Sequence, residues 1–240
     1  MTSGFVKTSL VILLLLNFII PVAKGAEKPV LNLDTGERFL TIQGAVGDPD
    51  TDDNDKIRVY SDQYDSAKEP GHHRIGDAEA FIFIDKSLTI TSTKGPKSTV
   101  IDGRKEHKVT VSINADGVTL KGFTVTGAVV PDEGKWAAGI HATGVKDIRI
   151  SNNRAVGNQG DGVHFFDTVN SKITGNVITN NNTLQDMFWV GNGIELHRSD
   201  NNEVLNNRIT KNESSGIYIF GSSQNKIKSN QLNNNKRFGS

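Results

Sequence analysis

From residue 81 onward, the chain alternates apolar and polar residues in short runs that end at Gly, Asn or Asp. FIFID, SLTITS, STVIDG, KVTVSI and VTLKGFTVTG are such runs. This alternation is typical of short β-strands with one buried face, so the pattern predicts an all-β chain. The segment RFLTIQGAV, residues 38–46, is the exception and is predicted as a short amphipathic helix. We expect this helix to cover the otherwise unpaired edges of the first strands.

The later part of the chain carries a repeat of about 23 residues. One column of the aligned repeats holds asparagines 23, 31 and 23 residues apart: Asn153, Asn176, Asn207 and Asn230. A second column holds glycines: Gly139, Gly162, Gly193, Gly216 and Gly239. Short strands separated by Asn and Gly turns suit the coils of a β-helix, in which each strand pairs with its equivalent one coil above. A leucine-rich repeat has a similar period, but its leucine framework is missing.

The asparagine column predicts a specific interaction. Identical polar side chains in stacked sheets can bond to one another and to the backbone along the axis. We therefore expect an inward, hydrogen-bonded asparagine ladder at one turn, with Phe123 in the same column capping it one coil earlier. Two glycosylation sequons begin at Asn181 and Asn212, five residues after ladder positions. We expect both of these asparagines to be exposed at a turn.

The N-terminus reads as an export signal. Residues 1–25 contain Lys7, an apolar run over residues 10–20, and Ala23-Lys24-Gly25 at the expected cleavage position. The apolar run is short for a membrane span, so we expect none after cleavage; a retained amphipathic anchor is the alternative. These features predict a secreted, periplasmic or cell-surface protein.

Two further segments follow the signal. Residues 26–80 are interpreted as an N-terminal cap and first coil, and residues 81–240 as the β-helix. The last repeat stops at Ser240, where a new strand should begin. We expect this incomplete coil to offer an edge for self-association.

Charge and cysteine content narrow the possible partners. The chain has 27 Lys+Arg and 27 Asp+Glu, and loss of Lys7 and Lys24 with the signal leaves 25 against 27. A nucleic-acid partner would require a clustered positive face, so we expect none. The absence of cysteine excludes disulfides and thiolate metal sites.

Several segments together resemble a known family. FLTIQGAV, DKIRVYSDQY, IDKSLTITSTKGPKSTVIDG and VTLKGFTVTG, followed by the Asn/Gly coils, resemble the NosD-like group of pectin-lyase-fold proteins. The resemblance covers nearly all of the chain after residue 25. It implies a single-stranded right-handed parallel β-helix with three short parallel sheets. The group includes copper-site maturation factors, surface proteins, polysaccharide lyases and epimerases, so the resemblance does not decide the activity.

Strand alternation places a candidate site after the glycine column. If the Ile or Val that follows each glycine points inward, the next residues point outward, and these are His141, His164, Glu195 and Tyr218. The next outward positions are Thr143, Phe166, His197 and Phe220. Because neighbouring coils lie about 4.8 Å apart, these side chains should form one patch. An incidental polar face is the alternative.

Two insertions should border this patch. AVVPDEGKW and NTLQDMFWV contain the only tryptophans, Trp136 and Trp189, and belong to alternate coils. They should flank the coil that carries His164 and Phe166. In the alternative arrangement, each tryptophan folds as a lid over its own coil.

Aromatic walls around polar groups suit a sugar, so we predict binding of a polysaccharide or cell-surface glycan. The predicted binding residues are Trp136, Trp189, His141, His164, Phe166, Tyr218 and Phe220. A polysaccharide lyase or epimerase is the second hypothesis, with His164 or His197 as base and Tyr218 as acid. Against it, the patch shows no Arg or Lys to neutralise a uronate carboxylate. A hydrolase would need paired carboxylates, for which the sequence offers Glu195 and, at the edge, Asp161.

Metal binding is the third hypothesis, although no cofactor is required by the other two. The predicted copper or zinc ligands are His141, His164, Glu195 and His197. A separate acidic segment, which resembles the start of a calcium loop, contains Asp48, Asp50, Asp52 and Asn54. Asp53 replaces the glycine of such a loop and no Glu follows at the twelfth position, which favours a solvated acidic turn.

Overall fold

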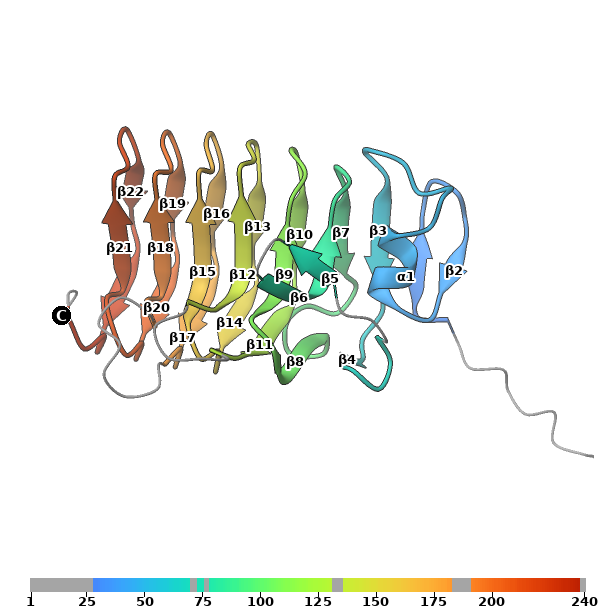
Figure 1. The fold of residues 1–240 in the computed structure, drawn as a ribbon, viewed down its shortest axis with the longest axis horizontal. Coiled ribbons are helices and arrows are strands. Elements are labelled where there is room, and N and C mark those ends of the chain that lie inside the picture. Colours follow the sequence, from blue (N-terminus) through green and yellow to red (C-terminus); the bar gives the residue numbers. More distant parts are fainter. Residues whose placement is uncertain (1–27, 70–72, 76–77, 131–135, 183–190, 238–240) are drawn as a thin grey trace, which may run out of the picture.

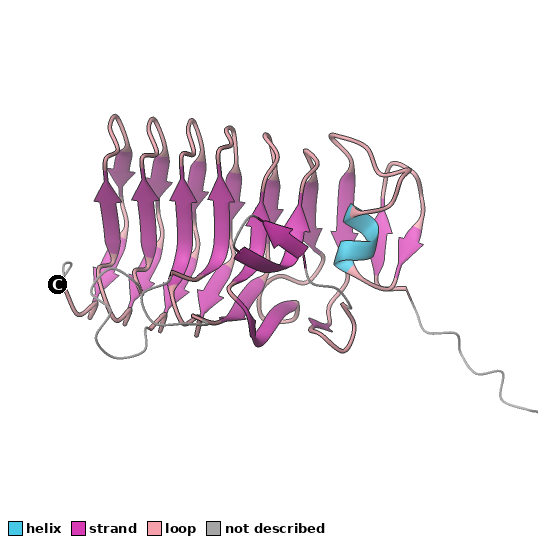
Figure 2. Cartoon of the chain, in the orientation of Figure 1, coloured by secondary structure: helices cyan, strands magenta, loops and turns pink. Residues whose placement is uncertain are grey.

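The computed structural model describes residues 28–69, 73–75, 78–130, 136–182 and 191–237. Short strands stack along one long axis, with the N-terminal strands at one end and the C-terminal strands at the other (Figure 1). Strands and turns make up nearly all of the described chain, and a single short helix lies near the N-terminal end (Figure 2). The chain is a right-handed parallel β-helix, which confirms the predicted fold class.

Three sheets run the length of the stack. The first sheet, in order, is β2 (Arg38–Phe39), β1 (Val30–Asn32), β3 (Lys56–Val59), β7 (Thr89–Ser92), β10 (Thr119–Lys121), β13 (Arg149–Ser151), β16 (Lys172–Thr174), β19 (Glu203–Leu205) and β22 (Lys226–Lys228). The second is β4 (Gln63–Tyr64), β8 (Val100–His107), β11 (Thr124–Ala128), β14 (Arg154–Val156), β17 (Val177–Thr179), β20 (Arg208–Thr210) and β23 (Gln231–Asn233). The third is β5 (His73–Ile75), β6 (Ala78–Ile84), β9 (Val109–Ile113), β12 (Ala138–Thr143), β15 (Asp161–Phe166), β18 (Ile194–His197) and β21 (Ile217–Phe220).

From β7 to β21, each coil contributes one strand to each sheet, and equivalent residues stack in register. On the third sheet, Ile140 pairs with Val163, Val163 with Ile194, and Ile194 with Ile217. The first three of these side chains are completely buried, so the column of β-branched residues forms one wall of the core. Among the described strands, pairing is antiparallel only where β1 meets β2 and β3 and where β5 meets β6.

The predicted asparagine ladder is present between the first and second sheets. The carboxamide oxygen of each asparagine accepts the backbone N–H of the equivalent residue one coil earlier, at 2.8–2.9 Å. Each Nδ2 also donates to a backbone carbonyl of the preceding coil. Phe123 begins the column as expected, because its own N–H donates to Asn153. The ladder therefore satisfies backbone groups that the turn would otherwise leave buried and unpaired.

A second asparagine ladder lies between the second and third sheets, and it corrects one expectation. It consists of Asn158, Asn181, Asn212 and Asn235, and all four accept and donate bonds as in the first ladder. Asn181 and Asn212, predicted as exposed sequon residues, are 0% and 1% exposed. Their side chains point inward because this turn also needs an amide to pair its backbone groups.

The glycine column faces this second ladder, and steric crowding explains why each position is a glycine. A Cβ added to Gly162 would lie 2.7 Å from the Nδ2 of Asn181, and one added to Gly193 would lie 2.9 Å from the Nδ2 of Asn212. The same Cβ on Gly193 would lie only 2.3 Å from a methyl group of Ile209. Glycine is required at these positions because the inward amide occupies the space that a side chain would fill.

Replacing Gly193 by alanine is therefore expected to lower the free energy of unfolding by about 1–3 kcal/mol, the usual cost of overpacking. Chemical denaturation of the variant measures this loss. Gly47→Ala serves as the control, because its added Cβ would meet nothing closer than 3.3 Å. Equal stability of the Gly193→Ala variant and the parent would show that the coil spacing relaxes freely.

The N-terminal helix is shorter than predicted. It spans only α1 (Ile42–Val46), and Thr41 caps it by accepting the Gly44 N–H at 2.8 Å. Residues 38–39 form a strand instead, because they pair with β1 across a tight hairpin. Glu69 binds the same helix start by accepting the N–H groups of Ile42 and Gln43.

Some predictions concern other parts of the chain. The signal segment, residues 1–25, lies outside the described residues. Among the described helices, none has the length and apolar character that crossing a membrane requires. In the last coil, Ile219, Phe220 and Ile227 are exposed. Self-association through this coil stays a prediction.

Candidate functional site

The outward columns predicted for the third sheet are in register. His141 pairs with His164, His164 with Glu195, and Glu195 with Tyr218. The second column is aligned in the same way, from Thr143 on β12 to Phe220 on β21. The parallel register therefore brings side chains that are 23 to 31 residues apart in the sequence onto one face.

Part of this face is buried, although the strand pattern predicted exposure. His141 and His164 are each 5% exposed, and Glu195 is 8% exposed. Trp136 packs against both histidines, with its ring centroid 4.5 Å from that of His141 and 5.3 Å from that of His164. Trp136 thus lies over its own coil and the next one. Trp189 lies outside the described residues.

A row of ring side chains, here called the aromatic strip, crosses the coils of the third sheet. Its members are Trp136, His141, His164, Phe166, His197 and Phe220. Successive ring centroids along the strip lie 4.5–6.3 Å apart, within the range of aromatic contacts. Exposure increases along the strip, from His164 at 5% to Phe220 at 54%. Among the described residues of the strip, Phe220 on β21 is the most exposed.

Lys108 adds a positive charge that the sequence did not suggest at this site. Its Nζ lies 4.1 Å from the ring centroid of Trp136, which is the geometry of a cation–π contact. The lysine immediately precedes β9, one coil before β12. Its register with the residue before Ala138 could have predicted from the sequence that it lies near Trp136. The expectation that the patch lacks Arg or Lys is therefore wrong.

The two buried histidines are neutral imidazoles. Burial lowers the pKa of His141 to about 4, and burial together with the neighbouring histidines and Lys108 holds the pKa of His164 well below its usual value. Among the described residues, Nδ1 of His141 and both ring nitrogens of His164 have no hydrogen-bond partner. Buried polar atoms without partners are unusual and call for an explanation.

Two carboxyl groups lie beside His164. Glu195 Oε1 is 3.9 Å from His164 Nε2, and Asp161 Oδ2 is 3.9 Å from His164 Nδ1. Burial, followed by the nearby charge of Glu195, raises the pKa of Asp161 well above its usual value. Asn192 links the pair, because its N–H donates to Asp161 at 2.7 Å and its Nδ2 donates to Glu195 at 3.2 Å.

Three of the four predicted copper or zinc ligands converge. Potential ligand atoms of His164, Glu195 and His197 all lie within 4.8 Å of one another. His197 Nδ1 is 3.5 Å from Glu195 Oε1. His141 is not part of this group, and its ring packs against those of Trp136 and His164.

The predicted calcium segment is arranged differently from a calcium loop. Asp48 and Asp50 gather with Glu37, with one carboxylate oxygen from each within 4.8 Å of the others. Asp52 instead forms a turn by donating its N–H to Asp55 at 3.1 Å. Calcium binding by this segment stays a prediction.

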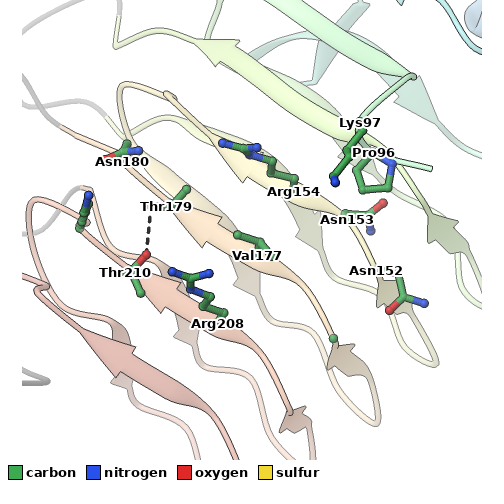
Figure 3. A pocket seen from close by; sticks show the side chains of 12 residues that line it. Pro96, Lys97, Asn152, Asn153, Arg154, Val177, Thr179, Asn180, Arg208 and Thr210 are labelled. Carbon is green, nitrogen blue, oxygen red and sulfur yellow. Dashed lines mark hydrogen bonds between the residues drawn. The ribbon is translucent and has the colours of Figure 1, made fainter. Parts of the chain in front are cut away.

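A shallow hollow of about 590 Å³ lies on the second sheet (Figure 3). Arg154 and Arg208 project from strands β14 and β20, and Lys97 and Lys211 complete the cationic part of its lining. The remaining lining residues described are uncharged. This hollow was not predicted, because its lysines and arginines come from different coils and form no local motif.

Known proteins share this fold. Residues 109–240 match the family model described as "Right handed beta helix region". A cell surface glycoprotein of Methanothermus fervidus is 31% identical over 214 residues, which cover 89% of this chain and 32% of that protein. The chain thus spans about a third of the relative's length.

A solved structure is also similar. A point mutant of the periplasmic alginate epimerase AlgG aligns with a TM-score of 0.51 at 16% identity, over 73% of this chain and 35% of that chain. At this level of identity, the likeness shows a common fold alone. Because the family model covers more than half of the chain, the protein belongs to the right-handed β-helix family.

Proposed function

We propose that this protein is an exported surface module that binds polysaccharide along the aromatic strip of the third sheet. The observation that carries the proposal is the continuity of the strip. Ring side chains from successive coils contact one another and end in the exposed Phe220. A linear polymer of rings can follow such a row, because its repeat can engage successive coils.

The part of the strip from Phe166 to Phe220 has the mixed chemistry that a saccharide requires. Phe220 offers an apolar face for sugar C–H groups, and His197 beside it can exchange hydrogen bonds with hydroxyl groups. The Arg198 guanidinium covers one face of Phe166, 4.5 Å from its ring centroid, and adds a charged donor to this part of the strip. His197 is 29% exposed, so its ring is accessible from solvent. Tyr218 lies half-buried on the same strand as Phe220 and adds a phenol to this end of the strip.

The comparisons support a surface role related to polysaccharide. The relative from Methanothermus fervidus is named a cell surface glycoprotein, and the structural neighbour is an alginate epimerase. The N-terminal signal pattern agrees with export. These names describe the relatives, and the proposal for this chain depends on the strip itself.

The proposal is tested by a glycan array followed by titration of the bound saccharide. Loss of one aromatic contact is expected to cost about 1–3 kcal/mol by analogy with base stacking, so Phe220→Ala should weaken affinity about tenfold to a hundredfold. Phe220 is exposed, so its loss should leave the melting temperature unchanged. Trp136→Ala should weaken binding and also lower the melting temperature, because Trp136 covers His141 and His164.

Two controls give the experiment its specificity. Leu40→Ala removes an equally exposed apolar side chain far along the stack and should not alter affinity. Arg154→Gln combined with Arg208→Gln tests the cationic hollow on the second sheet. If this pair abolishes binding of an acidic polysaccharide while Phe220→Ala has no effect, the hollow is the binding site and the strip is not. Ultraviolet-absorbing product from a bound uronate polymer would instead identify a lyase.

A further inference from the structure

We infer that His164, Glu195 and His197 form a binding site for a divalent transition-metal ion of the Zn²⁺ type. The site lies on β15 and β18 in the middle of the aromatic strip. Its three side chains come from adjacent strands, because His164 pairs with Glu195 and Phe166 pairs with His197. The inference stands independently of saccharide binding.

The distances between ligand atoms suit one ion. With ligand bonds of about 2.0–2.1 Å, two ligands of a tetrahedral zinc ion lie about 3.3 Å apart. The measured separations from Glu195 Oε1 are 3.5 Å to His197 Nδ1 and 3.9 Å to His164 Nε2. One ligand atom from each of the three side chains lies within 4.8 Å of the other two, so the ion would draw the side chains closer together on binding.

His164 is the strongest single indication of a ligand. Its side chain is more than nine-tenths buried, and neither ring nitrogen has a hydrogen-bond partner among the described residues. Leaving such a group unpaired costs about 1–3 kcal/mol. A metal ion bound to Nε2 would remove this penalty for that nitrogen, since a neutral imidazole is the form that coordinates metals.

Asp161 lies beside the second ring nitrogen of His164, the one that is not facing Glu195. Its Oδ2 lies 3.9 Å from the Nδ1 of His164, whereas Glu195 Oε1 lies 3.9 Å from the Nε2 of the same ring. Histidine ligands commonly donate their second N–H to a carboxylate, which orients the ring and strengthens the metal bond. Asn192 holds Asp161 and Glu195 together through its N–H and its side chain.

The ligand types select the class of ion. Two imidazoles and one carboxylate favour zinc, copper or iron over calcium or magnesium, which prefer oxygen alone. Three protein ligands also leave a coordination position open, as in catalytic rather than structural zinc sites. Solvent can reach that position past His197, the most exposed of the three ligands.

The experiment is a titration of chelator-treated protein with Co²⁺, followed by displacement with Zn²⁺, with no saccharide present. Bound Co²⁺ should develop visible absorption bands at one equivalent, and Zn²⁺ should remove them. His197→Ala and Glu195→Gln should each weaken Zn²⁺ binding, measured by calorimetry, by at least about a hundredfold. Glu203→Gln, which removes a carboxyl on β19 of the first sheet, is the matched control and should bind as the parent does.

Melting curves without metal establish that the variants fold. His197 is partly exposed, so His197→Ala should keep the parental melting temperature in chelator. Saturable binding that survives both His197→Ala and Glu195→Gln would overturn the inference, as would the absence of one-equivalent binding in the parent. A saccharide titration in the presence of chelator keeps the two proposals separate. Glycan binding without metal binding would contradict only the metal site, and metal binding without glycan binding would contradict only the saccharide proposal.

Discussion

Replacing Asn207 by alanine is expected to lower the free energy of unfolding by about 2–6 kcal/mol. Its carboxamide accepts the N–H and the Nδ2 of Asn176 and donates to the carbonyl of Ile173 and to Asn230, at 2.8–3.0 Å. Alanine would leave the Asn176 N–H and the Ile173 carbonyl buried without these partners. Each such group costs about 1–3 kcal/mol. Denaturant unfolding of the parent and the variant measures the difference.

The second ladder provides the matched comparison. Asn181→Ala should be destabilising in the same way, because Asn181 is completely buried and bonded to both neighbouring coils. Asn182→Ala, at the adjacent exposed position, should change stability little. If Asn181→Ala and Asn182→Ala unfold at the same denaturant concentration, the second ladder does not stabilise the coil stack.

Stability is also expected to fall as pH rises from about 4.5 to 7, through the titration of Glu69. Burial raises the pKa of this carboxyl from 4.5 to about 7. The folded protein therefore keeps a proton that the unfolded chain releases, so the favourable contribution is complete below pH 4.5 and is lost through pH 7. At about 1.4 kcal/mol per pKa unit, the loss is about 3 kcal/mol.

The Glu69→Gln variant isolates this effect. A glutamine can still accept an N–H from the start of α1, but it does not titrate. Measured from pH 4 to pH 8, its unfolding free energy should gain about 3 kcal/mol relative to the parent. The comparison is needed because buried Asp161 shifts stability in the same direction and buried His141 and His164 shift it in the opposite one. Glu106→Gln, which removes an exposed carboxyl, should run parallel to the parent. A parallel curve for Glu69→Gln would show that Glu69 is ionised in the fold.

The repeat pattern in the sequence was sufficient to predict the coils. Ile, Val and Asn recur at fixed positions because each coil must present the same inward residues to its neighbours. That constraint is local to one repeat, so it is visible in a linear alignment. The outward columns followed by simple alternation, and the structure confirms their register from His141 to Tyr218.

The same alignment did not reveal the second asparagine ladder. Asn181 and Asn212 fall in sequons and follow a strand, which suggested an exposed turn. Their inward orientation depends on the space beside Gly162 and Gly193. These glycines lie in the preceding coil, at the strands of the third sheet. A contact between different coils is not encoded in the order of residues within one repeat.

The sequence by itself determined which side chains share the third sheet's outer face, because a parallel register preserves the repeat. Only the tertiary structure decided their environment. Trp136 packs against His141 and His164, and the Nζ of Lys108 lies over the Trp136 ring. Asp161 lies beside the Nδ1 of His164. Burial and charge depend on what packs above a strand. The sequence pattern predicted His141 and His164 as exposed polar residues. Only the folded arrangement of several coils shows that they are buried neutral imidazoles.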